Sequence, residues 1–235
     1  GEGFQLHYQP VLNLQGESRE LYEAYLRLDH NGELMSPVAF LAIAEEHGLL
    51  ADINRWVVRR AIAILGERQR AGHATHMLVK ITPESFADPL LISTLKQELQ
   101  AHGVPGDRLW LHAPESKVFT HLRNAQQFLQ AVAPLGCRIG LEQFGSGLDS
   151  FQLLAHFQPQ FLKLDRGFTR DAASTRENFD KIKEITERAQ AANIATVAEF
   201  VTDANSMTLL FSAGVNYVQG EFVGEATPRM DFDFG

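Results

Sequence analysis

The chain alternates short apolar runs with longer segments whose apolar positions recur at helical spacing. This order becomes regular after Gly72, where each apolar run is followed by a turn and an amphipathic stretch. The apolar runs are predicted to be strands at residues 77–82, 108–113, 138–143, 161–165, 194–199 and 215–219. The stretches between them are predicted to be helices at residues 88–103, 121–134, 148–157, 173–192 and 203–213.

The residues before Gly72 follow a different pattern. Extended runs at 4–12 and 21–28 are separated by a polar turn, which predicts an antiparallel hairpin. Ser36-Pro37 is a helix start, an N-cap followed by proline in the first turn, and that helix ends near Gly48. Residues 52–71 carry an apolar stripe at helical spacing and are predicted to form a second helix packed on the core.

Strands that alternate with helices pair in parallel through right-handed crossovers and close readily into a barrel. Together with the opening hairpin, the pattern predicts an α/β fold of the TIM-like (β/α)8 type with an antiparallel first strand. A doubly wound open sheet is the alternative. Because no long linker, repeat or low-complexity stretch divides the chain, we expect residues 1–235 to form one domain.

Composition narrows the classes of partner. Hydrophobic residues make up 45% of the chain and charged residues 21%, which is typical of a globular protein. The net charge of −8 argues against nucleic acid as a partner, although a few placed cations can still hold a small anion. No apolar stretch is long enough to insert in a membrane, and the single cysteine, Cys137, favours a cytoplasmic location.

Polar and charged residues stand at the ends of the predicted strands. The C-terminal ends of barrel strands meet on one face, where active sites are built, so these side chains are expected to line one cavity that suits a polar ligand. The set comprises Glu23, Arg27, Lys80, His112, Glu142, Gln143, Lys163, Asp165, Glu199 and Gln219.

At these residues the chain resembles the EAL-domain cyclic di-GMP phosphodiesterases over nearly its whole length. The matching segments include Glu23-Ala24-Tyr25-Leu26-Arg27, Phe144-Gly145-Ser146-Gly147, Leu162-Lys163-Leu164-Asp165, Val197-Ala198-Glu199 and Val218-Gln219-Gly220. The resemblance implies an EAL-type barrel, and we expect the chain to be the C-terminal part of a longer multidomain signalling protein.

The resemblance also implies a reaction that depends on two divalent metal ions, and here the sequence departs from the family. Lys80 replaces an expected Asn, His112 an expected Glu, and Glu142 and Gln143 an expected pair of Asp residues. A lysine among the ligands would repel a divalent ion. We therefore expect no bound metal, no cofactor and no catalytic residue. Lys80 is expected instead to pair with Glu23, Glu142 or Glu199.

The positions that bind the dinucleotide in the family are better retained in this sequence than the positions that bind the metal ions. Arg27 carries a planar fork that suits phosphate oxygens, and Asn54 has an amide for a guanine edge, with an exposed helix-start residue as the alternative. Phe200 is expected to stack on a base, with core packing as its alternative. The predicted cyclic di-GMP site is Gln9, Tyr25, Leu26, Arg27, Pro37, Phe40, Asn54, Glu199, Phe200, Val201, Gln219 and Gly220.

Among degenerate members of the family, the chain is most similar to the EAL domains of FimX-type regulators of type IV pili. That resemblance implies a noncatalytic cyclic di-GMP receptor that acts in twitching motility through a PilZ-domain partner. A weak metal-dependent phosphodiesterase and a purely structural interaction barrel are the alternatives. A homodimer through residues 144–157 is left open.

Overall fold

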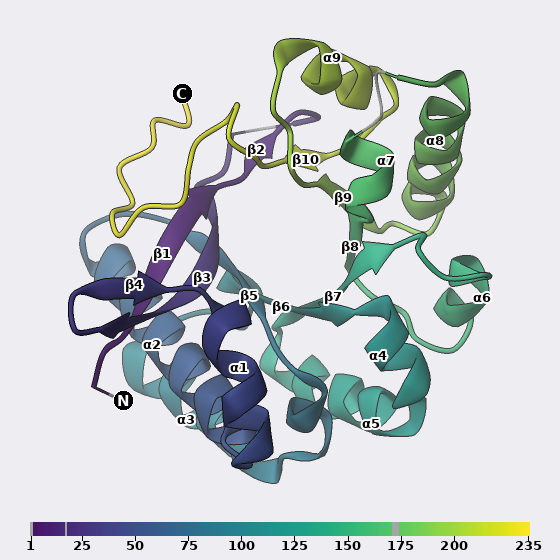
Figure 1. The fold of residues 1–235 in the computed structure, drawn as a ribbon. Coiled ribbons are helices and arrows are strands. Elements are labelled where there is room, and N and C mark those ends of the chain that lie inside the picture. Colours follow the sequence, from purple (N-terminus) through teal and green to yellow (C-terminus); the bar gives the residue numbers. More distant parts are fainter. Residues whose placement is uncertain (1, 17, 171–173) are drawn as a thin grey trace.

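The computed structural model describes residues 2–16, 18–170 and 174–235 (Figure 1). The strands are β1 (Phe4–Pro10), β2 (Leu12–Asn13), β3 (Leu21–His30), β4 (Glu33–Met35), β5 (His76–Lys80), β6 (Leu109–Pro114), β7 (Arg138–Phe144), β8 (Phe161–Leu164), β9 (Ala195–Ala198) and β10 (Tyr217–Val218). The helices are α1 (Pro37–Glu46), α2 (Leu50–Arg70), α3 (Pro89–His102), α4 (Glu115–Thr120), α5 (Leu122–Val132), α6 (Ser150–Leu154), α7 (Arg166–Arg170), α8 (Arg176–Ala191) and α9 (Ala204–Ser212).

The sheet curls into a nearly closed barrel. Its strand order is β1-β3-β5-β6-β7-β8-β9-β10-β2, with parallel pairing from β3 to β10. β1 pairs antiparallel with β3, and β2, which follows β1 almost at once, pairs antiparallel with β10. The two ends of the sheet therefore meet at the same stretch of chain, and the predicted barrel with an antiparallel first strand is confirmed.

Helices surround the barrel because each has one apolar face to bury (Figure 1). In α2 the buried positions include Val57, Val58, Ala61, Ile62 and Leu65, so the predicted stripe faces the core. Short polar side chains fix the helix starts. Asp88, for example, accepts a hydrogen bond from the Leu90 amide at the start of α3.

The interior of the barrel is filled by a second, separate apolar cluster. It consists of Val11, Leu21, Leu78, Trp110, Phe161, Val197 and Tyr217. At Gly140 the space that a side chain would need is taken by the Phe161 ring, which explains the absence of a side chain in the middle of β7. The barrel thus has a solid floor, and polar side chains above it cannot reach water from below.

Several element boundaries differ from the prediction. Residues 148–157 form only α6, which starts after the capping side chain of Asp149. The helix expected at 173–192 is observed as α8, and residues 171–173 lie outside the described part of the chain. The strand expected at 215–219 shortens to β10. Helices α4 and α7 and strand β4 were not predicted, because elements this short carry little periodicity.

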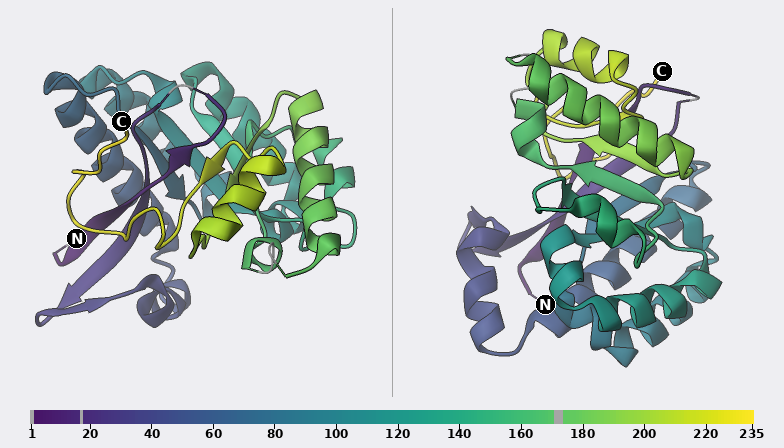
Figure 2. Two further views of the ribbon diagram at one scale, coloured as in Figure 1. Left: turned by 90° about the horizontal axis from the view of Figure 1, so that it is seen from above. Right: turned by 90° about the vertical axis from the view of Figure 1, so that its right-hand side faces the viewer.

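The C-terminal segment packs along the first strands, where Figure 2 shows it in yellow beside β1. The backbones of Tyr8 and Thr227 exchange hydrogen bonds of 2.7 and 3.1 Å. The Phe232 amide donates to the Tyr22 hydroxyl at 3.2 Å, and the ring of Phe234 lies edge-on to Tyr22. These contacts hold the C-terminal segment against β1 and β3.

Candidate functional site

A polar layer lies directly above the apolar floor of the barrel. Side chains two positions apart on a strand point to the same side, so each interior apolar residue is followed two positions later by an interior polar one. The pairs are Leu21 with Glu23, Leu78 with Lys80, Trp110 with His112, Gly140 with Glu142, Phe161 with Lys163, Val197 with Glu199 and Tyr217 with Gln219. Seven of the ten strand-end residues singled out by the sequence thus form one layer. Of the other three, Arg27 lies further along β3, Asp165 is half-buried just after β8, and Gln143 is exposed with a φ of +53°.

Glu23 is the centre of a buried ion-pair network. Its Oε1 lies 2.7 Å from His112 Nε2, and its Oε2 accepts a hydrogen bond of 2.8 Å from Lys163 Nζ. Lys163 also reaches Glu199 Oε1 at 2.7 Å. Lys163, His112 and Glu23 have side chains only 1–2% exposed.

Glu142 extends the network to the surface. Its Oε1 lies 2.7 Å from Lys80 Nζ, and its Oε2 lies 3.3 Å from His112 Nδ1. Lys80 is 53% exposed, so the network runs from the rim to the barrel interior. The prediction that Lys80 pairs with one of three glutamates is confirmed for Glu142. The other two glutamates are held by Lys163 and His112, which the sequence did not predict.

The network keeps its members charged despite burial. Burial raises the pKa of Glu23, but the charges of His112 and Lys163 and their hydrogen bonds outweigh it and lower that pKa to about 2. Burial lowers the pKa of His112, but the charge of Glu23 raises it above its usual value. Burial likewise opposes ionisation of Lys163, yet Glu199 and Glu23 hold its pKa well above the usual value. The network therefore favours the charged form of each of these three groups.

A hydrogen-bonded triad adjoins the ion pairs. Gln219 Nε2 donates to Tyr25 Oη at 3.0 Å and to Gln9 Oε1 at 3.2 Å, and the Tyr25 hydroxyl donates to the same Gln9 oxygen at 3.1 Å. Gln9 Nε2 in turn donates to the Gly224 carbonyl. Three predicted ligand residues from β1, β3 and the end of β10 are thus locked together, and the Gln219 Oε1 atom is left buried without a hydrogen-bond partner in the described residues.

Arg27 is placed by the alternation of β3, where it shares a face with Glu23 and Tyr25. Its guanidinium lies 5.5 Å from the centre of the Tyr25 ring, and Nη1 donates to the Leu26 carbonyl at 2.9 Å. The side chain is half-buried, and no carboxylate in the described part of the chain pairs with it. Arg27 therefore retains donors for an anion.

Phe200 stands at the rim beside Glu199. Its backbone has a φ of +59°, which ends β9 and turns the ring outward, so that the residue is 48% exposed. The core-packing alternative for Phe200 is wrong. The guanidinium of Arg166 lies 5.8 Å from the centre of its ring. Sequence reasoning missed Arg166, although its position directly after Asp165 at a strand end was a usable signal.

Val201 and Gly220 are buried neighbours beneath Phe200. The Val201 amide donates to the Gln219 carbonyl at 3.1 Å, and any side chain at Gly220 would collide with the Val201 backbone. Val201 is fully buried, so it has no side-chain surface to offer a ligand. Both residues shape the rim on which Phe200 and Gln219 stand.

Of the remaining predicted residues, Leu26 lies on β3 with its side chain packed against the core outside the barrel, and the other three lie on the first two helices. Asn54 is buried, and its amide exchanges hydrogen bonds of 2.7 and 3.2 Å with Thr82, just after β5. The alternative of an exposed Asn54 is therefore wrong, and the Thr82 contact accounts for its amide. Phe40 is also buried, 5.8 Å from the Phe4 ring, whereas Pro37 is half-buried at the start of α1. These three residues contact none of the ion-pair network through a hydrogen bond or ion pair in the described chain.

A carboxylate outside the predicted set organises the loop after β7. Glu115 is buried at the start of α4, and its Oε2 accepts a 3.0 Å hydrogen bond from the Gly145 amide. Leu148 in the same loop is fully exposed. This is the segment in which a homodimer was left open, and dimerisation stays a prediction.

Comparison with known proteins assigns the family. Residues 1–226 match the family described as EAL domain. The chain is an EAL domain. It is 67% identical to the EAL domain of Xanthomonas citri FimX, solved in complex with c-diGMP, with a TM-score of 0.97 over 100% of this chain and 92% of that one. The Pseudomonas aeruginosa FimX EAL domain bound to c-di-GMP is 33% identical, with a TM-score of 0.93 over 99% and 94% of the two chains.

Curated relatives of this EAL domain include enzymes. The cyclic di-GMP phosphodiesterase PdeF of Escherichia coli K12 is 28% identical over 97% of this chain but only 30% of its own length. The EAL domain thus spans about a third of the length of the curated relatives that it matches.

In the described residues no helix is both long and apolar enough to cross a membrane.

Proposed function

We propose that this EAL domain binds cyclic di-GMP on the C-terminal face of its barrel without hydrolysing it and passes the signal to a protein partner. The observation that carries the proposal is the ion-pair network above the barrel floor. Glu23, Glu142 and Glu199 are held by Lys80, Lys163 and His112, whose two ring nitrogens lie 2.7 and 3.3 Å from carboxylate oxygens of Glu23 and Glu142. The layer is therefore electrically balanced by the protein itself.

The residues do not fit the pair of divalent ions that hydrolysis in this family implies. A metal ion would have to share its carboxylates with two lysines and with His112. Two like unit charges about 4 Å apart repel by about 4 kcal/mol at an effective dielectric constant near 20, and a divalent ion doubles that repulsion. In the described chain no group of three or more His, Cys, Asp or Glu side chains has an arrangement that could hold a metal.

The rim offers the groups that a cyclic dinucleotide needs. Arg27 keeps free guanidinium donors for a phosphate, and a charged hydrogen bond of this kind contributes about 1.5–3 kcal/mol. The exposed ring of Phe200 can stack on a guanine, a contact that contributes about 1–3 kcal/mol. The hydrogen-bonded triad of Gln9, Tyr25 and Gln219 provides a rigid binding surface whose side chains lose little conformational freedom on binding.

The relatives support the same proposal. The FimX EAL domains of Xanthomonas citri and Pseudomonas aeruginosa are described as complexes with this dinucleotide. By this likeness we also propose a PilZ-domain protein as the partner, a role in type IV pilus and twitching motility control, and a cytoplasmic location. Co-elution of the domain with a candidate PilZ-domain protein, with and without cyclic di-GMP, tests the partner. Co-elution that ignores the dinucleotide would contradict the signalling role.

Calorimetry tests the binding proposal directly. Cyclic di-GMP is titrated into the domain in EDTA, and Mg²⁺ or Mn²⁺ is then added while the linear dinucleotide is sought by chromatography. We expect micromolar or tighter binding, about −8 kcal/mol, and no product. Product that forms only with metal would identify a phosphodiesterase, and no binding would leave a structural barrel.

A matched pair of variants tests where the phosphate binds. Arg27→Ala is expected to weaken binding by about tenfold or more, about 1.4 kcal/mol, because it removes a charged donor. Arg123→Ala, at an exposed arginine on α5 without an ion pair in the described residues, should bind as the unchanged domain does. Equal affinities for the two variants would refute the placement at Arg27.

A further inference from the structure

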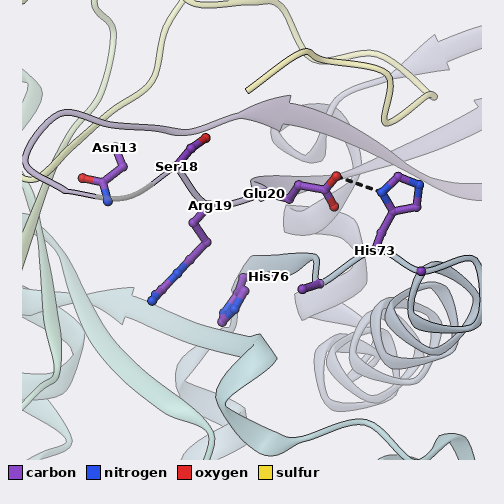
Figure 3. Close-up of a pocket in the computed structure, with 8 residues that line it drawn as sticks. Asn13, Ser18, Arg19, Glu20, His73 and His76 are labelled. Atoms are coloured by element: carbon purple, nitrogen blue, oxygen red, sulfur yellow. Dashed lines mark hydrogen bonds and ion pairs between the residues drawn. The ribbon is translucent and has the colours of Figure 1, made fainter. Parts of the chain in front are cut away.

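A pocket lies at the opposite end of the barrel from the ion-pair network. It has a volume of about 640 Å³ and is lined chiefly by Asn13, Ser18, Arg19, Glu20, His73 and His76 (Figure 3). Arg19 and Glu20 directly precede β3, and His76 begins β5, so these side chains surround the N-terminal ends of the strands. Small-molecule sites typically occupy about 300–1,000 Å³.

The carboxylate in this pocket is already neutralised. Glu20 Oε1 lies 2.9 Å from His73 Nδ1, and its Oε2 accepts hydrogen bonds from Arg68 at 3.3 Å and Thr75 at 2.9 Å. Figure 3 shows Glu20 turned toward His73 and away from Arg19. Glu20 therefore does not serve as the counter-ion of Arg19, even though the two residues are adjacent in sequence.

Three guanidinium groups gather at this end without anionic partners. Arg19 precedes β3, Arg108 precedes β6 and Arg138 begins β7, and none of them forms an ion pair or donates a side-chain hydrogen bond in the described residues. Arg138 lies over the Trp110 ring at 4.6 Å. The Trp110 ring in turn stands edge-on to the ring of His76, which lines the pocket. Arg138 is therefore separated from the pocket lining by the Trp110 ring.

The pKa values of His76 and Arg138 support the close approach of these arginines to the pocket. Burial first, and then the charges of Arg19 and Arg108, lower the pKa of His76 to about 4, so His76 is neutral at pH 7. Partial burial and then Arg19 also lower the pKa of Arg138. Among the described residues, Asp107 is the carboxylate whose charge acts on both His76 and Arg138, and Glu20 is held by Arg68 and His73.

We propose that this pocket, the Arg19 pocket, binds a small organic phosphate. Arginine forks match phosphate oxygens with parallel hydrogen bonds. A phosphate monoester carries about two negative charges at neutral pH, enough to balance Arg19, the arginine in the pocket lining, and one of the neighbouring arginines. The Asn13 and Ser18 side chains beside Arg19 add polar groups to the lining. The volume leaves room for an organic part beyond the phosphate itself.

Nuclear magnetic resonance of the labelled domain tests the Arg19 pocket. Inorganic phosphate and glycerol 3-phosphate, two probes without a base that could stack at Phe200, are titrated separately in phosphate-free buffer. We expect saturable shifts of the Arg19, His73 and Ala74 amides with glycerol 3-phosphate, and weaker binding of inorganic phosphate. Equal binding of the two probes would show that free phosphate is the ligand, and no saturable shift with either would overturn the proposal.

Variants separate this site from the cyclic di-GMP face. Arg19→Ala should weaken probe binding by about tenfold, and Arg19→Lys, which keeps the charge but loses the fork, should bind with intermediate affinity. Arg123→Ala should bind the probes as the unchanged domain does. All three variants should bind cyclic di-GMP normally, because Arg19 lies at the other end of the barrel. Unchanged probe binding in Arg19→Ala would overturn the assignment.

Discussion

Replacing Lys163 with methionine should destabilise the folded domain strongly. Methionine keeps most of the length of the side chain but removes the cation that lies 2.8 Å from Glu23 and 2.7 Å from Glu199. Lys163 is 1% exposed, so water cannot replace it. Loss of one partner from a buried ion pair costs about 3–5 kcal/mol, a large share of the roughly 5–15 kcal/mol that stabilises a typical domain.

Lys80→Met is the matched control, since Lys80 belongs to the same network but is 53% exposed. Its loss should cost about 1 kcal/mol or less, because solvent screens the pair with Glu142. Adding Glu199→Gln to Lys163→Met should restore part of the lost stability, because it removes a carboxylate whose ion pair is with Lys163, whereas Glu23 keeps His112.

Urea unfolding of the ligand-free domain at neutral pH measures these differences as free energies of unfolding, provided that the dependence on urea is the same for each variant. A Lys163→Met chain that does not fold counts as a loss equal to the whole stability. The reasoning would be refuted if Lys163→Met lost no more stability than Lys80→Met, since the buried network would then contribute little.

Three further predictions concern pH and packing. The pKa of Glu23 is lowered to about 2, so its contribution is present above about pH 4.5 and is lost as the pH falls toward 2; acid unfolding should be shallower in that interval for Glu23→Gln. Asn54→Ala should cost about 1–3 kcal/mol by leaving the Thr82 amide and hydroxyl unpaired, which thermal unfolding measures. Gly140→Ala should cost about 1–3 kcal/mol by overlap with the Phe161 ring, and an unchanged midpoint in urea would contradict the close approach seen there.

The alternation of strands and helices was sufficient to predict the barrel. Parallel pairing and right-handed crossovers follow from the order of elements, and the hairpin at the start predicts the antiparallel first strand. The same order predicts that strand-end residues meet, because strands in a parallel barrel all end on one face. The sequence therefore predicts that Glu23, His112, Lys163 and Glu199 lie in one site.

Only the tertiary structure decided which of these charges meet. Lys80 could reach any of three glutamates on sequence grounds, and the barrel assigns it to Glu142 while Lys163 and His112 hold Glu23. The solvent exposure of two predicted ligand residues also did not follow from the sequence, since Asn54 is buried against Thr82 and Phe200 faces outward. The gathering of Arg19, Arg108 and Arg138 depends on where three distant strands begin around the ring. Sequence periodicity determines which face of a strand a side chain occupies, but the pairing of charges depends on distances across the closed barrel.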